Sequence, residues 1–188
     1  MNQRHFKIHK PYGYLSQFKL VNPKKKRLLG ELFDFPEGIM SIGRLDETSE
    51  GLLLLTTDGK VSAKVNSGKI EKEYYAQIDG ILDDKALNQL MEGVELSHQG
   101  ETYISKPCIV TKLAKPPYFP DRTRKIRDDR HGPTSWISII LREGKFRQVR
   151  KMTALVGYPT LRLFRVRVGD IFLADMKAGE VEEVDSFF

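Results

Sequence analysis

Short apolar segments separated by turn residues recur along the chain and predict many strands with few helices between them. The clearest is the apolar run 52–55, which Gly51 precedes and Asp58-Gly59 follows. Further extended segments are predicted at 6–9, 39–45, 74–78, 103–113, 135–141, 161–168 and 171–173. Because strands dominate and do not alternate regularly with helices, we expect an α+β fold with a mainly antiparallel mixed sheet, not a doubly wound one.

Three helices are predicted between these strands. Asp58 and Asp83 are suited to cap short helices over 58–65 and 83–92, and a glycine follows each segment. The third helix is predicted over 145–156, where an apolar stripe and a separate basic stripe run at helical spacing. The apolar stripe consists of Phe146, Val149, Thr153 and Val156, and the basic stripe of Arg147, Arg150 and Lys151.

Length, composition and charge favour one globular domain that meets a polyanion. The 188 residues suit a single domain over 1–188, and 40% hydrophobic residues are enough for a packed core. Lys and Arg number 31 against 25 Asp and Glu, and the excess gathers at 24–27, 122–130 and 145–151. Such clusters attract nucleic acid, although a solvated basic surface would give the same composition. The polar, basic stretch 115–133 has no periodicity and is expected to be a long surface loop.

Several classes of protein are excluded by what the chain lacks. Cys108 is the only cysteine, so no disulfide can form within the chain, and it lies in an apolar run where a buried thiol is expected. The four histidines show no metal-ligand spacing. The N-terminal segment does not resemble a signal peptide, and no apolar run is long enough to cross a bilayer. We therefore expect a cytoplasmic protein without a membrane partner.

The segment from Gly43 to Gly59 is the densest candidate for chemistry. A polar, turn-forming stretch that contains Arg44 and Asp46 separates two apolar segments, so Asp46 is expected at the mouth of the site that the strands build. Taken alone, an aspartate in a loop more often merely begins a turn, and an arginine beside it can form a surface ion pair.

Three further segments change that balance. They are 9–16 (HKPYGYLS), 71–80 (EKEYYAQIDG) and 143–152 (EGKFRQVRKM). Together with the Gly-Arg-Leu-Asp segment, and in this order, they resemble the pseudouridine synthases that modify single sites of ribosomal RNA. In this branch the A type modifies small-subunit RNA, whereas the B, E and F types modify large-subunit RNA. The resemblance runs from His9 to about Val184 and implies the family's catalytic-domain fold. Only eight residues precede His9, so we expect no N-terminal S4-like RNA-binding module, and the chain looks most like the E type.

The resemblance implies three catalytic residues. Asp46 matches the catalytic carboxylate, which acts either as a nucleophile or as a base. Tyr74 matches the tyrosine that stacks on the target base, although a strand tyrosine is more commonly part of the core. Arg150 matches the basic partner of the aspartate, and Arg147, one turn away, is the alternative for that role.

Substrate contacts follow from the same resemblance. Leu161 matches an aliphatic position of the uracil pocket, although by itself it would be assigned to the core. The target nucleotide must leave its stack to react, and Arg44 is placed to fill the vacated space or to hold phosphate. Arg147 is a further candidate for RNA binding.

The implied function is isomerisation of one uridine in 23S ribosomal RNA, near the peptidyl-transferase region. The reaction is redox-neutral, so no cofactor and no metal are expected, and we expect a monomer. The alternative is a non-catalytic ribosomal-RNA-binding or ribosome-assembly protein with the same fold, for which a carboxylate facing a polyanion has no use. A basic nuclease is disfavoured, because neither paired carboxylates nor histidine clusters occur.

Overall fold

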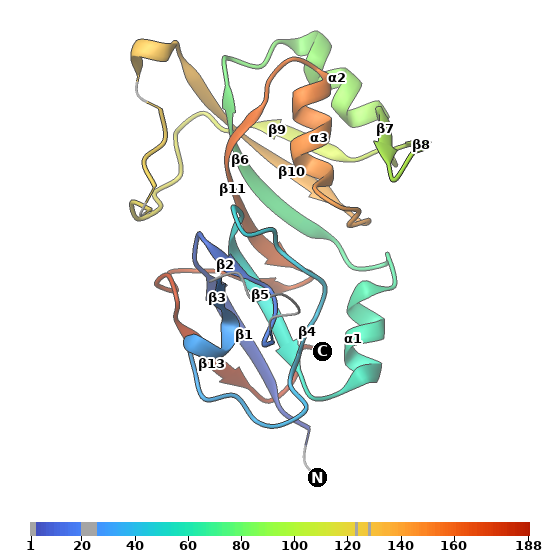
Figure 1. Ribbon diagram of the computed structural model, residues 1–188. Helices are drawn as coiled ribbons and strands as arrows, with labels where there is room; N and C mark the ends of the chain where they lie inside the picture. Colours follow the sequence, from blue (N-terminus) through green and yellow to red (C-terminus); the bar gives the residue numbers. More distant parts are fainter. Residues whose placement is uncertain (1–2, 20–25, 123, 128) are drawn as a thin grey trace. The chain divides into compact units, whose positions relative to one another are not determined.

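Two compact units make up the protein. The computed structural model describes residues 3–19, 26–122, 124–127 and 129–188. Unit 1 holds residues 1–70 and 164–188, and unit 2 holds residues 71–163 (Figure 1). The first unit thus combines the N-terminal part of the chain with its C-terminal segment.

Unit 1 is built around a fully buried strand. β5 (Glu50–Thr56) is buried at every position and pairs antiparallel with β1 (His5–Lys10). β1 also pairs with β13 (Val181–Val184), and β5 runs parallel to the second half of β11 (Thr160–Val168). Shorter elements complete the unit: β2 (Tyr14–Leu15), β3 (Arg27–Leu28), η1 (Leu29–Glu31), β4 (Met40–Ser41), α1 (Gly59–Asn66) and β12 (Ile171–Phe172). A strand buried on both faces reads as a continuous apolar run, which is the pattern of 52–55.

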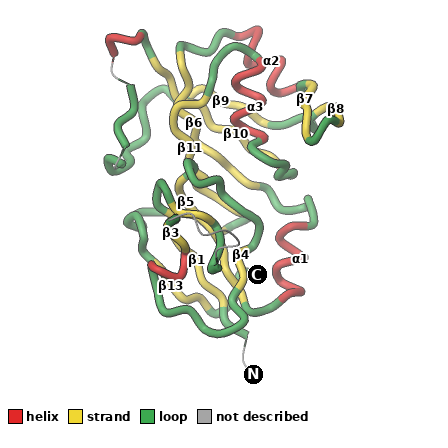
Figure 2. The backbone as a smooth tube through the Cα atoms, in the orientation of Figure 1, coloured by secondary structure: helices red, strands yellow, loops and turns green. Residues whose placement is uncertain are grey.

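Three neighbouring strands of unit 2 are antiparallel. β10 (Thr134–Leu141) lies between β6 (Lys72–Asp79) and β9 (Ile109–Lys112). The burial of β6 alternates along its length, as expected for a strand with one face in the core. The unit also contains α2 (Asp84–Glu92), the hairpin of β7 (Glu95–His98) and β8 (Glu101–Ile104), η2 (Asp129–His131) and α3 (Gln148–Leu155). Figure 2 shows the long loop that the sequence predicts between β9 and β10.

The predicted capping residues of the first two helices are confirmed. The Asp58 carboxylate accepts a hydrogen bond from the backbone N–H of Lys60 at 2.7 Å, and that of Asp83 accepts one from Ala86 at 2.7 Å. Each bond satisfies a donor that the first turn of a helix leaves open. α2 ends at Glu92, and the φ of 107° at the following Gly93 suits glycine.

Two predicted strands are wrong in extent. The segment 103–113 is split into β8 and β9, because Pro107 has no N–H and the backbone of Ser105 pairs instead with Val94 (Ser105 N to Val94 O, 2.9 Å). Of the segment 39–45, only Met40–Ser41 is a strand, and the rest turns toward Asp46.

The third helix begins later than its periodicity predicts. α3 starts at Gln148 rather than Lys145, because Arg147 adopts a left-handed backbone conformation with φ of 52°. Val149 and Thr153 of the predicted apolar stripe are buried, but Phe146 is 58% exposed. The amphipathic pattern thus includes a turn that precedes the helix. No helix in the described part of the chain is long and apolar enough to cross a membrane.

Candidate active site

Asp46 lies on a turn that is hydrogen-bonded to the N-terminal segment. The Ser16 hydroxyl donates to the carbonyl oxygen of Leu45 at 2.8 Å and accepts from the Leu45 N–H at 3.0 Å. The Gly13 N–H donates to the carbonyl oxygen of Glu47 at 2.8 Å. Hydrogen bonds to the backbone of Leu45 and Glu47, on either side of Asp46, therefore fix the turn, while the Asp46 side chain stays partly accessible. Arg44, two residues earlier, is exposed.

Three buried, charged side chains lie close to this turn: Lys10, Glu50 and Arg165. We call them the Lys10 cluster. All three side chains are almost completely buried. The Lys10 Nζ donates to the carbonyl oxygens of Pro11 (2.9 Å) and Tyr14 (2.7 Å). The Arg165 Nε donates to the carbonyl oxygen of Leu52 at 2.7 Å. These bonds tie the motif 9–16 to its own turn and β11 to β5.

The electrostatics of the cluster extend to the turn that holds Asp46. Burial lowers the pKa of Lys10 from 10.5 to about 7, against the opposing attraction of Glu50, Asp46 and Glu47. Arg165 adds to the lowering through its like charge. Lys10 therefore contributes positive charge near Asp46 in a way that depends on pH near neutrality.

Gly51 allows the close approach of β5 and β11 beside this cluster. A Cβ at Gly51 would clash with the carbonyl oxygen of Arg165 and would lie 2.8 Å from its backbone nitrogen. The φ of Gly51, 103°, lies in the region that favours glycine. Any side chain at this position would separate the two strands that hold Glu50 and Arg165.

In unit 2, Tyr74 lies on β6 opposite Ile139 of β10 and is 8% exposed. The sequence left open that Tyr74 is a core residue, and most of its side chain is indeed buried. A small accessible fraction remains, as a residue that contacts a base would need.

Arg150 and Leu161 come together within unit 2. The Arg150 Nη1 on α3 donates to the carbonyl oxygen of Thr160 at 3.2 Å, and Leu161 is the next residue of β11. The hydroxyls of Thr153 and Thr160 lie 2.7 Å apart and link α3 to the same strand. Arg147 is exposed and precedes the helix. Of the two arginines, Arg150 is the more buried.

Two arginines anchor the basic loop 115–133, one from the loop and one from β11. Arg127 forms an ion pair with Asp79 on β6 and donates to the carbonyl oxygen of His131. The Arg162 Nη2 donates to the carbonyl oxygen of Pro120 at 2.6 Å. Arg127 is therefore engaged within unit 2, whereas Arg124 and Lys125 are exposed.

The other basic cluster of the sequence, 24–27, is described only in part. Residues 24 and 25 lie outside the described residues, as do 123 and 128 of the cluster 122–130. The Lys26 Nζ forms an ion pair with the Glu47 carboxylate at 2.8 Å, one residue after Asp46. Lys26 thus offsets part of the negative charge on the turn that holds Asp46.

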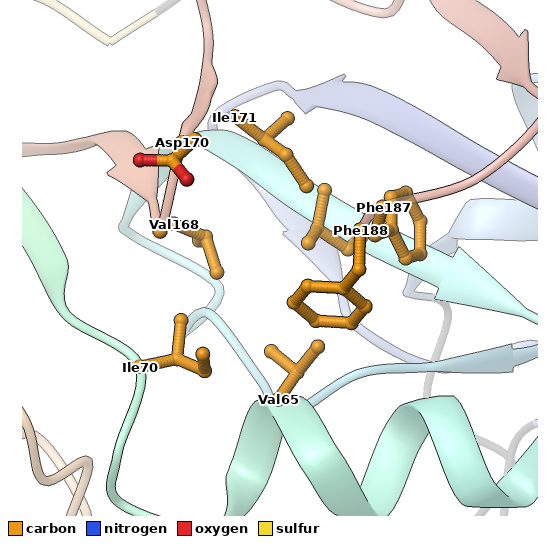
Figure 3. Close-up of a pocket in the computed structure, with 9 residues that line it drawn as sticks. Val65, Ile70, Val168, Asp170, Ile171, Phe187 and Phe188 are labelled. Carbon is orange, nitrogen blue, oxygen red and sulfur yellow. The ribbon is translucent and has the colours of Figure 1, made fainter.

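A pocket in unit 1 has the wrong chemistry for this site. Its cavity of about 90 Å³ is lined mainly by aliphatic and aromatic side chains, among them Val65, Val168 and Phe187 (Figure 3). Of the described residues that line it, only Asp170 has a charged side chain. Such a lining suits neither a phosphate nor the polar edge of a base.

Cysteine and metal chemistry receive no support from the described residues. Cys108 is half-buried rather than fully buried, and its thiol donates to the carbonyl oxygen of Leu90 at 3.1 Å. Burial raises the pKa of this thiol to about 11, which keeps it protonated at neutral pH. Among residues 3–19, 26–122, 124–127 and 129–188, no three His, Cys, Asp or Glu side chains gather as metal ligands would.

The order of the sequence motifs agrees with the match of this chain to a protein-family model. A family model described as RNA pseudouridylate synthase matches residues 4–155, which include the Asp46 turn, β6 and α3. The chain belongs to this family. It is 41% identical over 175 residues to ribosomal large subunit pseudouridine synthase E of Xanthomonas campestris pv. campestris, covering 92% of this chain and 91% of the relative. It is 37% identical to the protein of the same name from Vibrio parahaemolyticus, covering 97% of this chain and 74% of the relative.

A solved structure supports the fold. A crystal structure of a pseudouridylate synthase superposes with a TM-score of 0.74 at 26% identity, covering 97% of this chain and 70% of that one. The predicted α+β class with a mostly antiparallel sheet is confirmed, and the resemblance stated from the motifs is confirmed by the family match.

The candidate residues divide between the two units. Asp46 and Arg44 lie in unit 1, whereas the other candidates lie in unit 2: Tyr74, Arg147, Arg150 and Leu161. The pairing of Asp46 with Arg150 stays a prediction. Sequence reasoning missed the Lys10 cluster. The visible signal was the charged residues at the ends of apolar strand segments, because a charge that is buried there requires a partner.

Proposed function

We propose that this protein isomerises a uridine of large-subunit ribosomal RNA to pseudouridine, with Asp46 as its catalytic carboxylate. The observation that carries the proposal is a half-buried carboxylate on a turn that the Ser16 hydroxyl holds through the backbone of Leu45, in a chain of the pseudouridylate synthase family. The curated relatives named as large-subunit enzymes support this substrate class.

The reaction needs no external group. The C1′–N1 bond breaks, the uracil turns, C5 joins C1′, and the proton displaced from C5 leaves while N1 gains one. Asp46 serves this sequence either by attacking the nucleotide or by removing a proton from the sugar. Tyr74 stacks on the base, and Arg150 orients the carboxylate. A uracil within an RNA helix must be flipped out to reach these groups.

Three substrate-binding roles complete the proposal. Leu161 lines the uracil pocket, next to the carbonyl that Arg150 contacts. Arg44 and Arg147 are both exposed, and they suit phosphate contact or the space that the flipped base leaves. The enzyme works as a cytoplasmic monomer without a cofactor, and its target lies near the peptidyl-transferase region of 23S RNA.

The test compares Asp46→Asn with Asp34→Asn, an exposed aspartate of the same unit. Tritium release from an unmodified large-subunit RNA transcript labelled at uridine C5 measures turnover, and a binding titration measures affinity. Asp46→Asn should abolish tritium release, because the negative charge of the carboxylate is needed for the chemistry. RNA affinity should be nearly unchanged, because that charge makes no attractive contact with phosphate. Appreciable turnover by this variant would exclude the assignment.

The same assay separates the enzyme from a non-catalytic RNA-binding protein. A binding protein would give no tritium release with the unaltered chain while retaining RNA affinity. Mapping pseudouridines in ribosomal RNA from cells with and without the gene would then identify the modified position.

A further inference from the structure

We infer that an exposed aromatic and basic surface of unit 2 binds an unpaired nucleotide of the RNA that flanks the target uridine. This surface, called the Phe146 surface below, consists of Lys145, Phe146, Lys151, His98 and Tyr103. The inference rests on the proposed function and adds where a second nucleotide is held: its base stacks on the Phe146 ring and its phosphate lies between the two lysines.

A pinned turn keeps the Phe146 ring outside the core. The Gln148 N–H donates to the carbonyl oxygen of Lys145 at 3.1 Å, and the Gln148 side-chain oxygen accepts from the Lys145 N–H at 3.0 Å. The left-handed conformation of Arg147 then redirects the chain into α3. Phe146 therefore lies at the tip of a closed turn, 58% exposed, while Val149 in the following helix is buried.

The β7–β8 hairpin supports one side of this ring. The rings of His98 and Phe146 lie 5.8 Å apart at an interplanar angle of 33°. The Lys151 Nζ lies 5.6 Å from the centre of the Phe146 ring and donates to the carbonyl oxygen of Ser97 at 2.7 Å. The ring is thus held in place and still presents accessible area, which is the arrangement that a stacking platform requires.

Two lysines, Lys145 and Lys151, give the surface its positive charge. Lys145 lies with its Nζ 3.5 Å from the centre of the Tyr103 ring. The nearby carboxylate of Glu143 is engaged by the Lys106 N–H and by the Gln148 side chain, and Glu95 and Glu101 lie on the hairpin strands. Lysine is depleted in the centres of protein interfaces, whereas phosphate attracts it. The lysines therefore favour nucleic acid over a protein partner.

The surface continues into the candidate residues of unit 2. Lys151 is next to Arg150 in α3, and Phe146 is next to Arg147. An RNA strand that contacts Arg147 would therefore also reach the neighbouring Phe146 ring. Stacking needs no particular base, because every base has a flat face, so the contact would contribute affinity rather than sequence choice.

The experiment compares Phe146→Ala with Phe172→Ala. Phe172 is 56% exposed and lies in unit 1, so it is a matched control for loss of an exposed phenyl ring. Affinity for the unmodified large-subunit transcript should fall roughly five- to 150-fold for Phe146→Ala and stay unchanged for the control. The KM for tritium release should rise in step, with a smaller effect on kcat. Equal affinities for Phe146→Ala and the unaltered chain would overturn the inference.

Two further variants separate stacking from simple loss of structure. Phe146→Trp keeps a flat ring and should keep affinity, whereas Phe146→Leu keeps an apolar side chain and should lose it. The one native tryptophan, Trp136, is 8% exposed, so the introduced indole reports on the surface by fluorescence. The transcript should quench it, whereas inorganic polyphosphate, which has charge but no bases, should not. Equal quenching by both would rule out base stacking.

The lysines are tested by salt dependence. Lys151→Gln should lower the slope of log affinity against log salt by about 0.7, as expected for one lost phosphate contact on a single strand. An unchanged slope would remove the phosphate from the proposal. Failure of the proposed function would be distinct, because the unaltered chain would then release no tritium although its binding could still respond to Phe146.

Discussion

Lys10 should make the stability of this protein depend on pH above neutrality. The side chain is fully buried, and its Nζ donates to the carbonyl oxygens of Pro11 and Tyr14. Burial lowers its pKa from 10.5 to about 7, although Glu50, Asp46 and Glu47 attract the charge. In the unfolded chain the same lysine keeps its proton up to about pH 10.5.

The sign follows from proton binding in the two states. Between pH 7 and 10.5 the unfolded chain binds more protons at Lys10 than the folded protein, so the free energy of unfolding rises with pH. The gain is about 1.4 kcal/mol per pH unit, or about 5 kcal/mol across the whole window. Below pH 7 both states are protonated, and the cost of the buried ammonium is present in full.

Lys10→Met removes the titrating group and nearly preserves side-chain length. Urea unfolding of both proteins at pH 7 and pH 9 gives the test, and the stability of the unaltered chain relative to Lys10→Met should rise by about 2.5 kcal/mol between these values. Lys7→Met, on the same strand, serves as the comparison for loss of a lysine that pairs with Glu182 at the surface. A difference between the unaltered chain and Lys10→Met that is constant across this pH range would refute the reasoning.

Three other outcomes are expected. Arg150→Ala should reduce turnover more than RNA affinity, and Arg150→Lys should have a milder effect because only the planar guanidinium is lost. Arg147→Ala should act mainly on RNA affinity. The reverse pattern in kcat and KM would exchange the roles assigned to the two arginines. Gly51→Ala should lower the free energy of unfolding by about 3 kcal/mol or more, since its Cβ would meet the Arg165 carbonyl oxygen, whereas Gly59→Ala has open space and should change little in the same urea titration. Tritium release should persist in EDTA when the RNA fold is controlled separately, and activity that returned only with added metal would contradict the redox-neutral, metal-free scheme.

The local elements of this protein follow from its sequence because their causes are local. The apolar run 52–55 predicts a buried strand, and the capping carboxylates of Asp58 and Asp83 predict where two helices begin. The motif order from His9 to Lys151 was also enough to identify the family, since it depends only on residue types and spacing.

Other features were decided by contacts between residues far apart in the chain or by the closing of a turn. Periodicity extended the third helix to Lys145, but the turn closed by Gln148 leaves Phe146 outside it. Ser105 pairs with Val94 rather than continuing a strand. In each case the local structure depends on the relative free energies of alternative contacts. A pattern in one sequence does not say which residues are close enough to make those contacts.

The environment of the Asp46 turn is the clearest case. The sequence by itself determined that Asp46 follows Arg44-Leu45 between apolar segments, and which family such a motif belongs to. Only the tertiary structure brought Ser16 to Leu45 and enclosed Lys10 with Glu50 and Arg165. The reason is physical: a residue's burial and the charges around it depend on the strands that pair beside it, here β1, β5 and β11, which lie more than a hundred residues apart at their extremes.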